Sequence, residues 1–170
     1  MQESLLHGKK ILAVDDESDV LMVLEEEIRE SCPDCKFDKA ATYEKAIKMM
    51  GSKKYDLVIL DIMGVRGFEL LDRAVKNNLP VVMLTAHALT PDALKQSIQK
   101  MARVYLPKER MGEIVPFLEY VLQHEYLTGW KMLFKKLGGF FSDRWGKDWQ
   151  KTDEIFWKEF NKRLYMPNDS

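Results

Sequence analysis

The strongest constraint on the fold is a regular alternation of strand-like and helix-like segments along residues 1–125. Residues 57–60 and 81–84 are apolar without a break, which is typical of parallel strands covered on both faces. Stretches with apolar residues at helical spacing separate such runs. This alternation predicts an α/β fold, a parallel sheet with helices on both faces and right-handed crossovers. The expected strands are 9–16, 36–42, 55–63, 79–86 and 103–108, and the expected helices are 18–31, 43–50, 68–78, 90–101 and a last one that ends at about residue 125.

Two of the expected helices have clear sequence signals at their ends. Thr42 precedes the helix 43–50 and is a good N-cap residue, and Gly51 is expected to end that helix. Thr90 and Pro91 form a second start signal, because Pro is favoured at the first helical position.

Polar side chains follow the expected strands where each strand ends. Asp15 and Asp16 follow the first strand, Asp61 the third, Thr85 the fourth and Lys108 the fifth. In an open parallel sheet these ends meet at one edge, where ligands bind. Each residue alone is an ordinary turn residue, helix cap or surface charge. Three neighbouring carboxylates, however, are costly without a cation, and oxygen ligands of this kind suit Mg²⁺.

The same edge has the chemistry for an anionic substrate. A carboxylate such as Asp61 can act as a nucleophile toward phosphorus and form an acyl phosphate. Phosphoryl transfer depends on positioning and on positive charge around the transferred oxygens. Mg²⁺, the Lys108 ammonium and the Thr85 hydroxyl would supply both.

Four motifs resemble the receiver domain of two-component response regulators of the chemotaxis type. They are "VDDE" (14–17), "VILDIM" (58–63), "MLTAHA" (83–88) and "YLPK" (105–108), and the resemblance covers about residues 8–125. It implies a flavodoxin-like, doubly wound sheet of five parallel strands in the order 2-1-3-4-5. It also implies a cytoplasmic phosphoprotein that signals and is not an enzyme, apart from slow autodephosphorylation at most.

The resemblance implies a role for each matching residue. Asp61 resembles the phosphoacceptor, which takes its phosphoryl group from a sensor histidine kinase or a phosphotransfer protein. Asp15 and Asp16 resemble the acidic pair that holds Mg²⁺ together with Asp61, and the backbone carbonyl of Met63 resembles a further metal contact.

Three residues resemble the part of the family site that responds to phosphorylation. Thr85 resembles the hydroxyl residue that follows the phosphoryl group, and Lys108 the lysine that pairs with it. Tyr105 resembles the aromatic switch whose rotamer changes with Thr85. His87 stands at a position that tunes the loss of phosphate in the family, and a solvent-facing histidine without a role is the alternative.

The sequence departs from the family pattern at two places. Gly67 follows Asp61 by only six residues and no proline intervenes, so the loop is expected to be two residues shorter than usual. Glu109 follows Lys108 where the family usually has proline, often after a cis bond. A cis bond before a residue other than proline costs about 2.5–4 kcal/mol, so either that strain is kept or Lys108 is held less firmly.

Residues 126–170 are expected to form a separate, aromatic-rich and all-helical extension that carries the output. The extension contains all four tryptophans. A first apolar stripe is expected to stop at Gly138 and Gly139, and a second is interrupted near Thr152 and Asp153. The stripes comprise Trp130, Leu133, Phe134 and Leu137 in the first, and Trp145, Trp149, Phe156, Phe160 and Leu164 in the second.

The aromatic-rich composition of the extension is compatible with several roles. A helical cap packed on the receiver domain or on a second copy of the chain is favoured. A surface for another protein is next, because aromatic residues anchor interfaces. A membrane-surface helix is less favoured. The segment shows no helix-turn-helix or winged-helix pattern, so DNA binding is not expected.

Composition and the cysteines exclude other classes of protein. The net charge of −1 gives no sign of a nucleic-acid binder, and neither a membrane span nor a secretory signal is present, so a cytoplasmic location is expected. Cys32 and Cys35 form a CxxC in a segment expected to be a surface loop, because it follows a helix and precedes a strand. Zinc would need two more ligands, and the three histidines are scattered singly.

Two rival functions share parts of this pattern. A phosphatase of the haloacid-dehalogenase type also uses an aspartate at a strand end, but it needs a second aspartate at the position of Met63. A flavodoxin-like binding module that is never phosphorylated would need neither the acidic pair nor Lys108.

Overall fold

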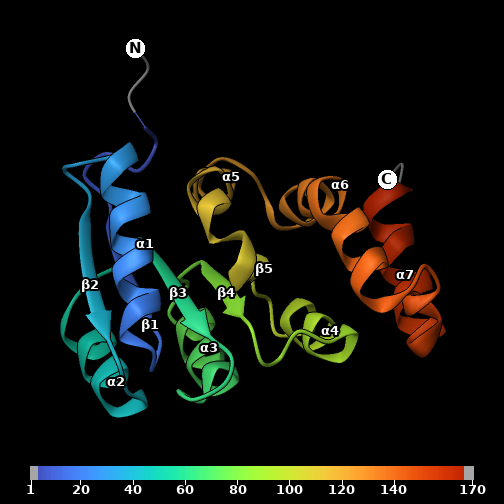
Figure 1. Ribbon diagram of the computed structural model, residues 1–170, viewed down its shortest axis with the longest axis horizontal. Helices are drawn as coiled ribbons and strands as arrows, with labels where there is room; N and C mark the ends of the chain where they lie inside the picture. Colours follow the sequence, from blue (N-terminus) through green and yellow to red (C-terminus); the bar gives the residue numbers. More distant parts are fainter. Residues whose placement is uncertain (1–3, 167–170) are drawn as a thin grey trace.

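The computed structural model describes residues 4–166 and confirms the expected sheet (Figure 1). Five parallel strands lie in the order β2-β1-β3-β4-β5. All residues of β3 and β4 are buried, in agreement with the unbroken apolar runs 57–60 and 81–84. The strands are β1 Lys10–Val14, β2 Lys36–Ala40, β3 Leu57–Asp61, β4 Val81–Thr85 and β5 Val104–Pro107.

Helices cover both faces of the sheet. In Figure 1, α1 and α5 lie on one face and α2, α3 and α4 on the other. The last receiver-like helix is preceded by a short 3₁₀ segment, η1, that starts directly at the end of β5. These elements are α1 Ser18–Ser31, α2 Tyr43–Ser52, α3 Gly67–Lys76, α4 Pro91–Gln99, η1 Lys108–Glu113 and α5 Ile114–Gln123.

The expected helix caps are present. The Thr42 hydroxyl accepts a hydrogen bond from Lys45 N at 3.1 Å, and the Thr90 hydroxyl accepts one from Ala93 N at 3.1 Å. The expected end of α2 at Gly51 is wrong, because the helix continues through Ser52. A glycine does not end a helix unless the chain needs a left-handed residue there, and Gly51 has no positive φ.

The C-terminal region is helical and packs along the β5 edge of the sheet, beside α4 and α5 (Figure 1). It contains α6 Tyr126–Trp145, η2 Trp149–Asp153 and α7 Glu154–Tyr165. The expected break at Gly138 and Gly139 is wrong: α6 runs through both, because tertiary packing of its apolar face outweighs the low helix propensity of glycine. The break near Thr152 is present as the boundary of η2 and α7.

Aromatic side chains fill the interior of the extension, of which the structure describes residues 126–166. Trp130 is fully buried, and its indole lies 6.1 Å from the ring of Phe134 and 6.5 Å from that of Phe160. The buried side chains of the extension belong to the same apolar core as the sheet. The division of the chain at residue 125 therefore remains a prediction about its units, although α5 and α6 are distinct helices.

Polar contacts also tie the extension to the sheet and to α4. Within α6, the Trp130 indole N–H donates to Ala102 O at 3.0 Å and the Tyr126 hydroxyl donates to Ile98 O at 2.6 Å. The two carbonyls belong to α4 and to the turn between α4 and β5, and α6 itself packs against β5, so the extension covers this edge of the sheet and keeps it from pairing with other chains. Among the described residues no helix combines the length and the apolar character needed to cross a bilayer.

Candidate active site at the carboxyl ends of the strands

The structure brings Asp15, Asp16 and Asp61 together at one edge of the sheet. Each offers a carboxylate oxygen within 4.8 Å of the others. β1 and β3 are neighbours, with Val14 opposite Leu60, so the residues at their ends meet. Asp15 and Asp61 are buried, whereas Asp16 is exposed.

Burial and mutual repulsion make this cluster unfavourable when all its carboxylates are charged. Burial and, to a smaller extent, the negative charge of Asp15 together raise the pKa of Asp61 to about 7, against an opposing effect of Lys108. Burial likewise raises the pKa of Asp15. The cluster consists of oxygen donors and requires positive charge, so its residues fit a hard divalent cation.

Lys108 reaches the same cluster from the end of β5. Its Nζ lies 2.9 Å from Asp15 Oδ2 and 3.5 Å from Asp61 Oδ1, but it does not align as a hydrogen-bond donor to either. Burial lowers the pKa of Lys108, yet contact with the two aspartates outweighs burial and raises it. The ammonium therefore partly balances the carboxylates.

Glu109 follows Lys108 at the position where the family usually has proline. The described residues contain no cis peptide bond, so the strained alternative is wrong. The Lys108 side chain is buried, with only 8% of its surface exposed. The Glu109 carboxylate accepts a hydrogen bond from Arg144 in α6 at 2.6 Å, so this position contacts the extension.

Two glycines close the short loop after Asp61: Gly67, whose spacing from Asp61 already marked the loop as short, and Gly64, which sequence reasoning did not single out. At Gly64, with φ of +86°, a Cβ atom would lie 2.4 Å from Asp16 Oδ2. At Gly67 a Cβ would lie 2.0 Å from the carbonyl oxygen of Asp61. The "GVRG" sequence was the available signal, because close backbone approach requires glycine. The role of the Met63 carbonyl stays a prediction.

A chain of hydrogen bonds leads from Thr85 to Tyr105. The buried Thr85 hydroxyl accepts from Ala88 N at 2.9 Å. The Tyr105 hydroxyl donates to Ala88 O at 2.8 Å and accepts from Thr90 N at 3.2 Å. The Tyr105 ring is fully buried, 6.1 Å from that of Phe141 in α6.

His87 is not part of the buried cluster. Its side chain is 72% exposed, and Nε2 lies 3.7 Å from Glu17 Oε1. It is close enough to the site to influence it, but nothing in its packing assigns it a role. Its tuning of phosphate loss remains a prediction.

A comparison with known families agrees with this geometry. Residues 11–117 match the model of the response regulator receiver domain, which is more than half of the chain. The chain belongs to this family. Receiver domains are in general signalling modules that bind Mg²⁺ at an acidic pocket, and here Asp15, Asp16 and Asp61 form such a pocket.

Two relatives with assigned functions come from Arabidopsis thaliana. "Two-component response regulator ARR18" is 37% identical over 107 residues, which are 59% of this chain and 16% of the relative. "Two-component response regulator ARR12" is 31% identical over 127 residues, which are 70% of this chain and 20% of the relative. The chain thus spans a small part of either protein's length.

Solved structures show the same fold. A putative response regulator from Chloroflexus aurantiacus J-10-fl has a TM-score of 0.60 and 27% identity, with 68% of this chain and 98% of that chain covered. A CheY-like receiver domain protein from Methanospirillum hungatei JF-1 has a TM-score of 0.56 and 21% identity, with 68% and 97% covered. Because residues 11–117 match the receiver-domain family and both curated relatives are named response regulators, the phosphatase and the flavodoxin-like module are not favoured.

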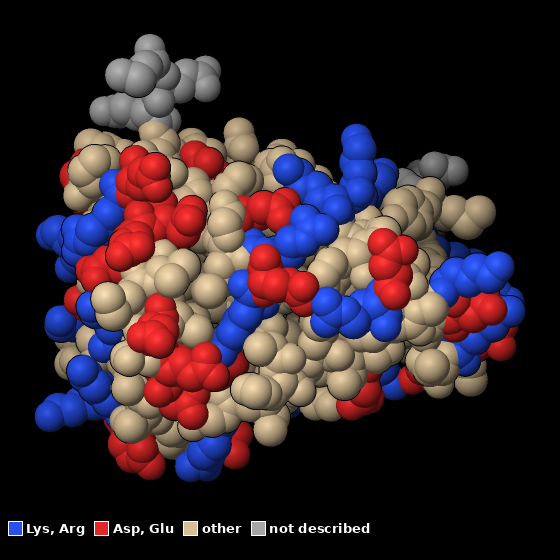
Figure 2. Space-filling view, viewed as in Figure 1, with Lys and Arg blue, Asp and Glu red and all other residues tan. Residues whose placement is uncertain are grey.

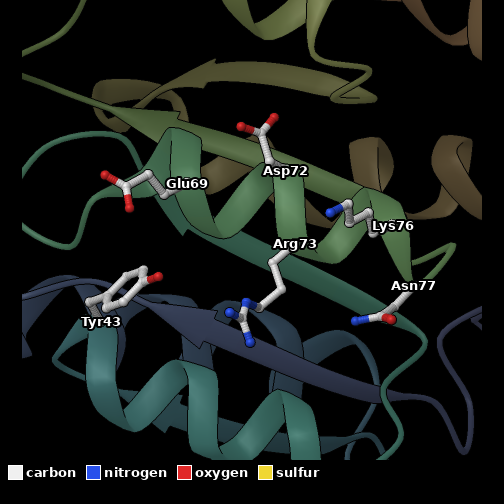
Figure 3. A pocket seen from close by; sticks show the side chains of 6 residues that line it. All are labelled: Tyr43, Glu69, Asp72, Arg73, Lys76 and Asn77. Atoms are coloured by element: carbon white, nitrogen blue, oxygen red, sulfur yellow. The ribbon is translucent and has the colours of Figure 1, made fainter.

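The surface around the receiver domain is unevenly charged. Figure 2 shows acidic side chains gathered over α1, which begins two residues after Asp16. A separate pocket of about 430 Å³ lies between α2 and α3 (Figure 3). Its lining combines both signs of charge, so it offers no selective field for an anion or a cation: Tyr43, Glu69, Asp72, Arg73, Lys76 and Asn77.

Proposed function

We propose that this receiver domain is a cytoplasmic switch in which Asp61 accepts a phosphoryl group from a phosphohistidine on a sensor histidine kinase or a phosphotransfer protein. The observation that carries the proposal is the meeting of Asp15, Asp16 and Asp61 with the Lys108 ammonium at one edge of the sheet. Residues 1–125 would receive the signal and residues 126–170 would transmit it.

In the proposed reaction an oxygen of the Asp61 carboxylate attacks phosphorus. The P–N bond to the imidazole breaks, and the imidazole leaves with the electron pair and takes up a proton. Lys108 Nζ, 3.5 Å from Asp61 Oδ1, is placed to pair with an oxygen of the transferred group. The Thr85 hydroxyl would donate to another after it turns from Ala88 N.

The acidic pair has a separate role in this reaction. Asp15 and Asp16, together with Asp61 and the Met63 carbonyl, are assigned to hold Mg²⁺. When bound, the ion supplies positive charge for the oxygens of the phosphoryl group. We expect at most slow autodephosphorylation, since the partly occluded cluster limits the approach of water, and the exposed His87 is the residue placed to alter that rate.

The loop between β4 and α4 connects the site to the extension. Ala88 bonds to Thr85 through its N–H and to Tyr105 through its carbonyl. The carbonyl of the adjacent Leu89 accepts a hydrogen bond from the Trp145 indole at 3.1 Å. Movement of Thr85 toward a phosphoryl group would therefore disturb a contact of α6. The resulting shift is limited by the difference in phosphoryl-group affinity between the two states.

Tryptophan fluorescence tests both parts of this proposal, because all four tryptophans lie in the extension. The full chain is mixed with Mg²⁺ and beryllofluoride, a phosphoryl mimic, or with acetyl phosphate. We expect a change in fluorescence, together with a mass increase for acetyl phosphate. Both should be absent in Asp61→Asn and present in Asp19→Asn, an exposed control in α1.

The two parts can fail separately. A parent-like mass increase in Asp61→Asn would refute the assignment of the phosphoacceptor. A mass increase in the parent without any fluorescence change would instead refute the coupling to the extension. Light scattering in both states then asks whether the chain self-associates through residues 126–170, and affinity capture asks whether that region binds another protein.

A further inference from the structure

A second group of metal-ligand side chains lies far along the sheet from the acidic cluster. His7, Cys32 and Asp34 each offer a ligand atom, and the three atoms lie within 4.8 Å of one another. Their positions along the chain do not suggest that they meet, because His7 precedes β1 and the other two lie between α1 and β2. The fold brings His7 and Asp34 to Cys32, whereas Cys35, the other residue of the cysteine motif, is not part of the group.

Both segments that supply these side chains are held in place. Leu6, next to His7, is fully buried, and Gly8, with φ of +71°, lets the chain turn after it. On the other side, Cys35 N donates to Cys32 O at 3.2 Å, which closes a tight turn around Asp34. The backbone of both segments is therefore fixed, and each ligand atom lies on a short side chain.

The side chains of this cluster already contact one another. The Cys32 thiol donates to Asp34 Oδ1 at 3.0 Å, and His7 Nδ1 pairs with Asp34 Oδ2. Ligand atoms of a tetrahedral zinc site with bonds of about 2.0–2.3 Å are separated by about 3–4 Å, so the observed spread needs little adjustment.

The buried thiol decides which metal suits this group. We propose that His7, Cys32 and Asp34 bind Zn²⁺, with water as the fourth ligand. One sulfur, one imidazole nitrogen and one carboxylate oxygen form a mixed donor set that favours zinc or cobalt over Mg²⁺. Bound metal would join the segment before β1 to the turn before β2, and the thiol proton would pass to solvent.

A buried cysteine in this turn is not sufficient for the site, because Cys35 is also buried there and takes no part in it. Cys35 is also buried, but its thiol donates to Lys9 O at 3.3 Å and does not belong to the cluster. The two cysteines are free in the structure. Cys35 is therefore a matched control for Cys32 in the same turn.

The test is a titration of the full, reduced chain with Co²⁺. Mg²⁺ is present in excess so that it occupies the cluster of Asp15, Asp16 and Asp61 and keeps Co²⁺ from binding there. We expect a thiolate-to-cobalt charge-transfer band that reaches one cobalt per chain and disappears when Zn²⁺ is added. Cys32→Ser should abolish the band, whereas Cys35→Ser should keep it. The exposed variants His7→Gln and Asp34→Asn should weaken binding by about tenfold or more while folding is unaffected, and His124→Gln should bind as the parent does.

Several results would overturn the site. One is the absence of the band in the parent chain, which would mean that the three side chains only bond to one another. Another is a band that survives Cys32→Ser, or parent-like affinity in both His7→Gln and Asp34→Asn. Because the last two variants alter surface side chains, loss of folding in Cys32→Ser would not obscure the answer.

Discussion

The acidic cluster buries charged groups, which costs stability, whereas the extension buries aromatic rings, which adds stability. In the cluster, Asp15 and Asp61 are buried beside each other, and burial raises the pKa of both carboxyls. In the extension, aromatic rings are buried against one another, with Trp145 stacked 4.9 Å from Phe141. The first arrangement costs stability in the absence of a cation, whereas the second contributes stability.

The difference shows where function and stability reside in this chain. A site that binds a metal and a phosphoryl group contains carboxylates whose mutual repulsion is relieved only when the metal is bound. The extension covers the β5 side of the same domain and compensates for part of that cost through apolar burial. Tyr105 lies between the two, since it bonds to the β4–α4 loop and packs on Phe141.

The largest expected effect comes from removing the central aromatic residue of the extension. Trp130→Ala should lower the free energy of unfolding by about 3–5 kcal/mol, because it leaves a cavity and frees the carbonyl of Ala102. Urea unfolding measures the loss. Ile155→Ala, at a side chain that is 82% exposed, should change stability by less than about 0.5 kcal/mol. Equal effects of the two variants would mean that the extension is not packed on the sheet.

In the acidic cluster a substitution is expected to raise the free energy of unfolding. Asp61→Asn should stabilise the metal-free protein at pH 8 by about 2–4 kcal/mol, because it removes a charge that is buried beside Asp15. The ordinary pKa of 3.8 rises to about 7 in the folded protein, so the stabilising contribution of Asp61 is complete below pH 3.8 and is lost as the pH rises through 7.

The pH and metal dependence of this effect distinguishes it from an unspecific one. The difference between Asp61→Asn and the parent should be small at pH 4 and should grow toward pH 8. Saturating Mg²⁺ should stabilise the parent more than the variant and so reduce the difference. A constant difference at all pH values, with or without Mg²⁺, would contradict the proposed repulsion.

An intermediate loss of stability is expected for Tyr105, which lies between the acidic cluster and the extension. Tyr105→Phe removes a buried hydroxyl that bonds to Ala88 O and Thr90 N, and should cost about 1–2 kcal/mol. The ring contact with Phe141 is kept. If the loop transmits the signal, the variant should still be phosphorylated at Asp61 but show a smaller fluorescence response; an unchanged response would place the coupling elsewhere.

The sheet and the position of the acidic cluster could be predicted from sequence for a physical reason. Strands buried on both faces leave unbroken apolar runs, and parallel topology brings their carboxyl ends together. Asp15, Asp61 and Lys108 could therefore be placed beside one another from their positions after strands. The close approach of Gly64 to Asp16 could not, because it depends on the path of a loop.

The packing of the extension was less predictable. Its apolar stripes indicated helices, but glycine propensity suggested a break where α6 is continuous at Gly138 and Gly139. Helical spacing also does not reveal which surface a stripe covers. The contact of Trp145 with Leu89, and likewise the meeting of His7 with Cys32, joins segments whose proximity only the tertiary fold creates.

The smallest expected effect concerns the charged contact at the edge of the extension. Asp153 pairs with Lys95 of α4, and its Oδ1 also accepts from Phe156 N at 3.3 Å as the N-cap of α7. Contact with Lys95 lowers the pKa of Asp153, so the carboxylate is charged at neutral pH. Asp153→Asn keeps a capping oxygen but loses the charge, and should lower the melting temperature only slightly, and only at low salt.

A matched variant separates the two roles of Asp153. Asp153→Ala loses both the ion pair and the cap, so it should be the more destabilised at every salt concentration. Lys95→Met should resemble Asp153→Asn, since both remove only the ion pair. If Asp153→Asn is instead as damaging as Trp130→Ala, then charge rather than aromatic packing holds the extension to α4, and the contrast between the two regions fails. If all three variants at these positions melt as the parent does, the aromatic core alone fixes the extension.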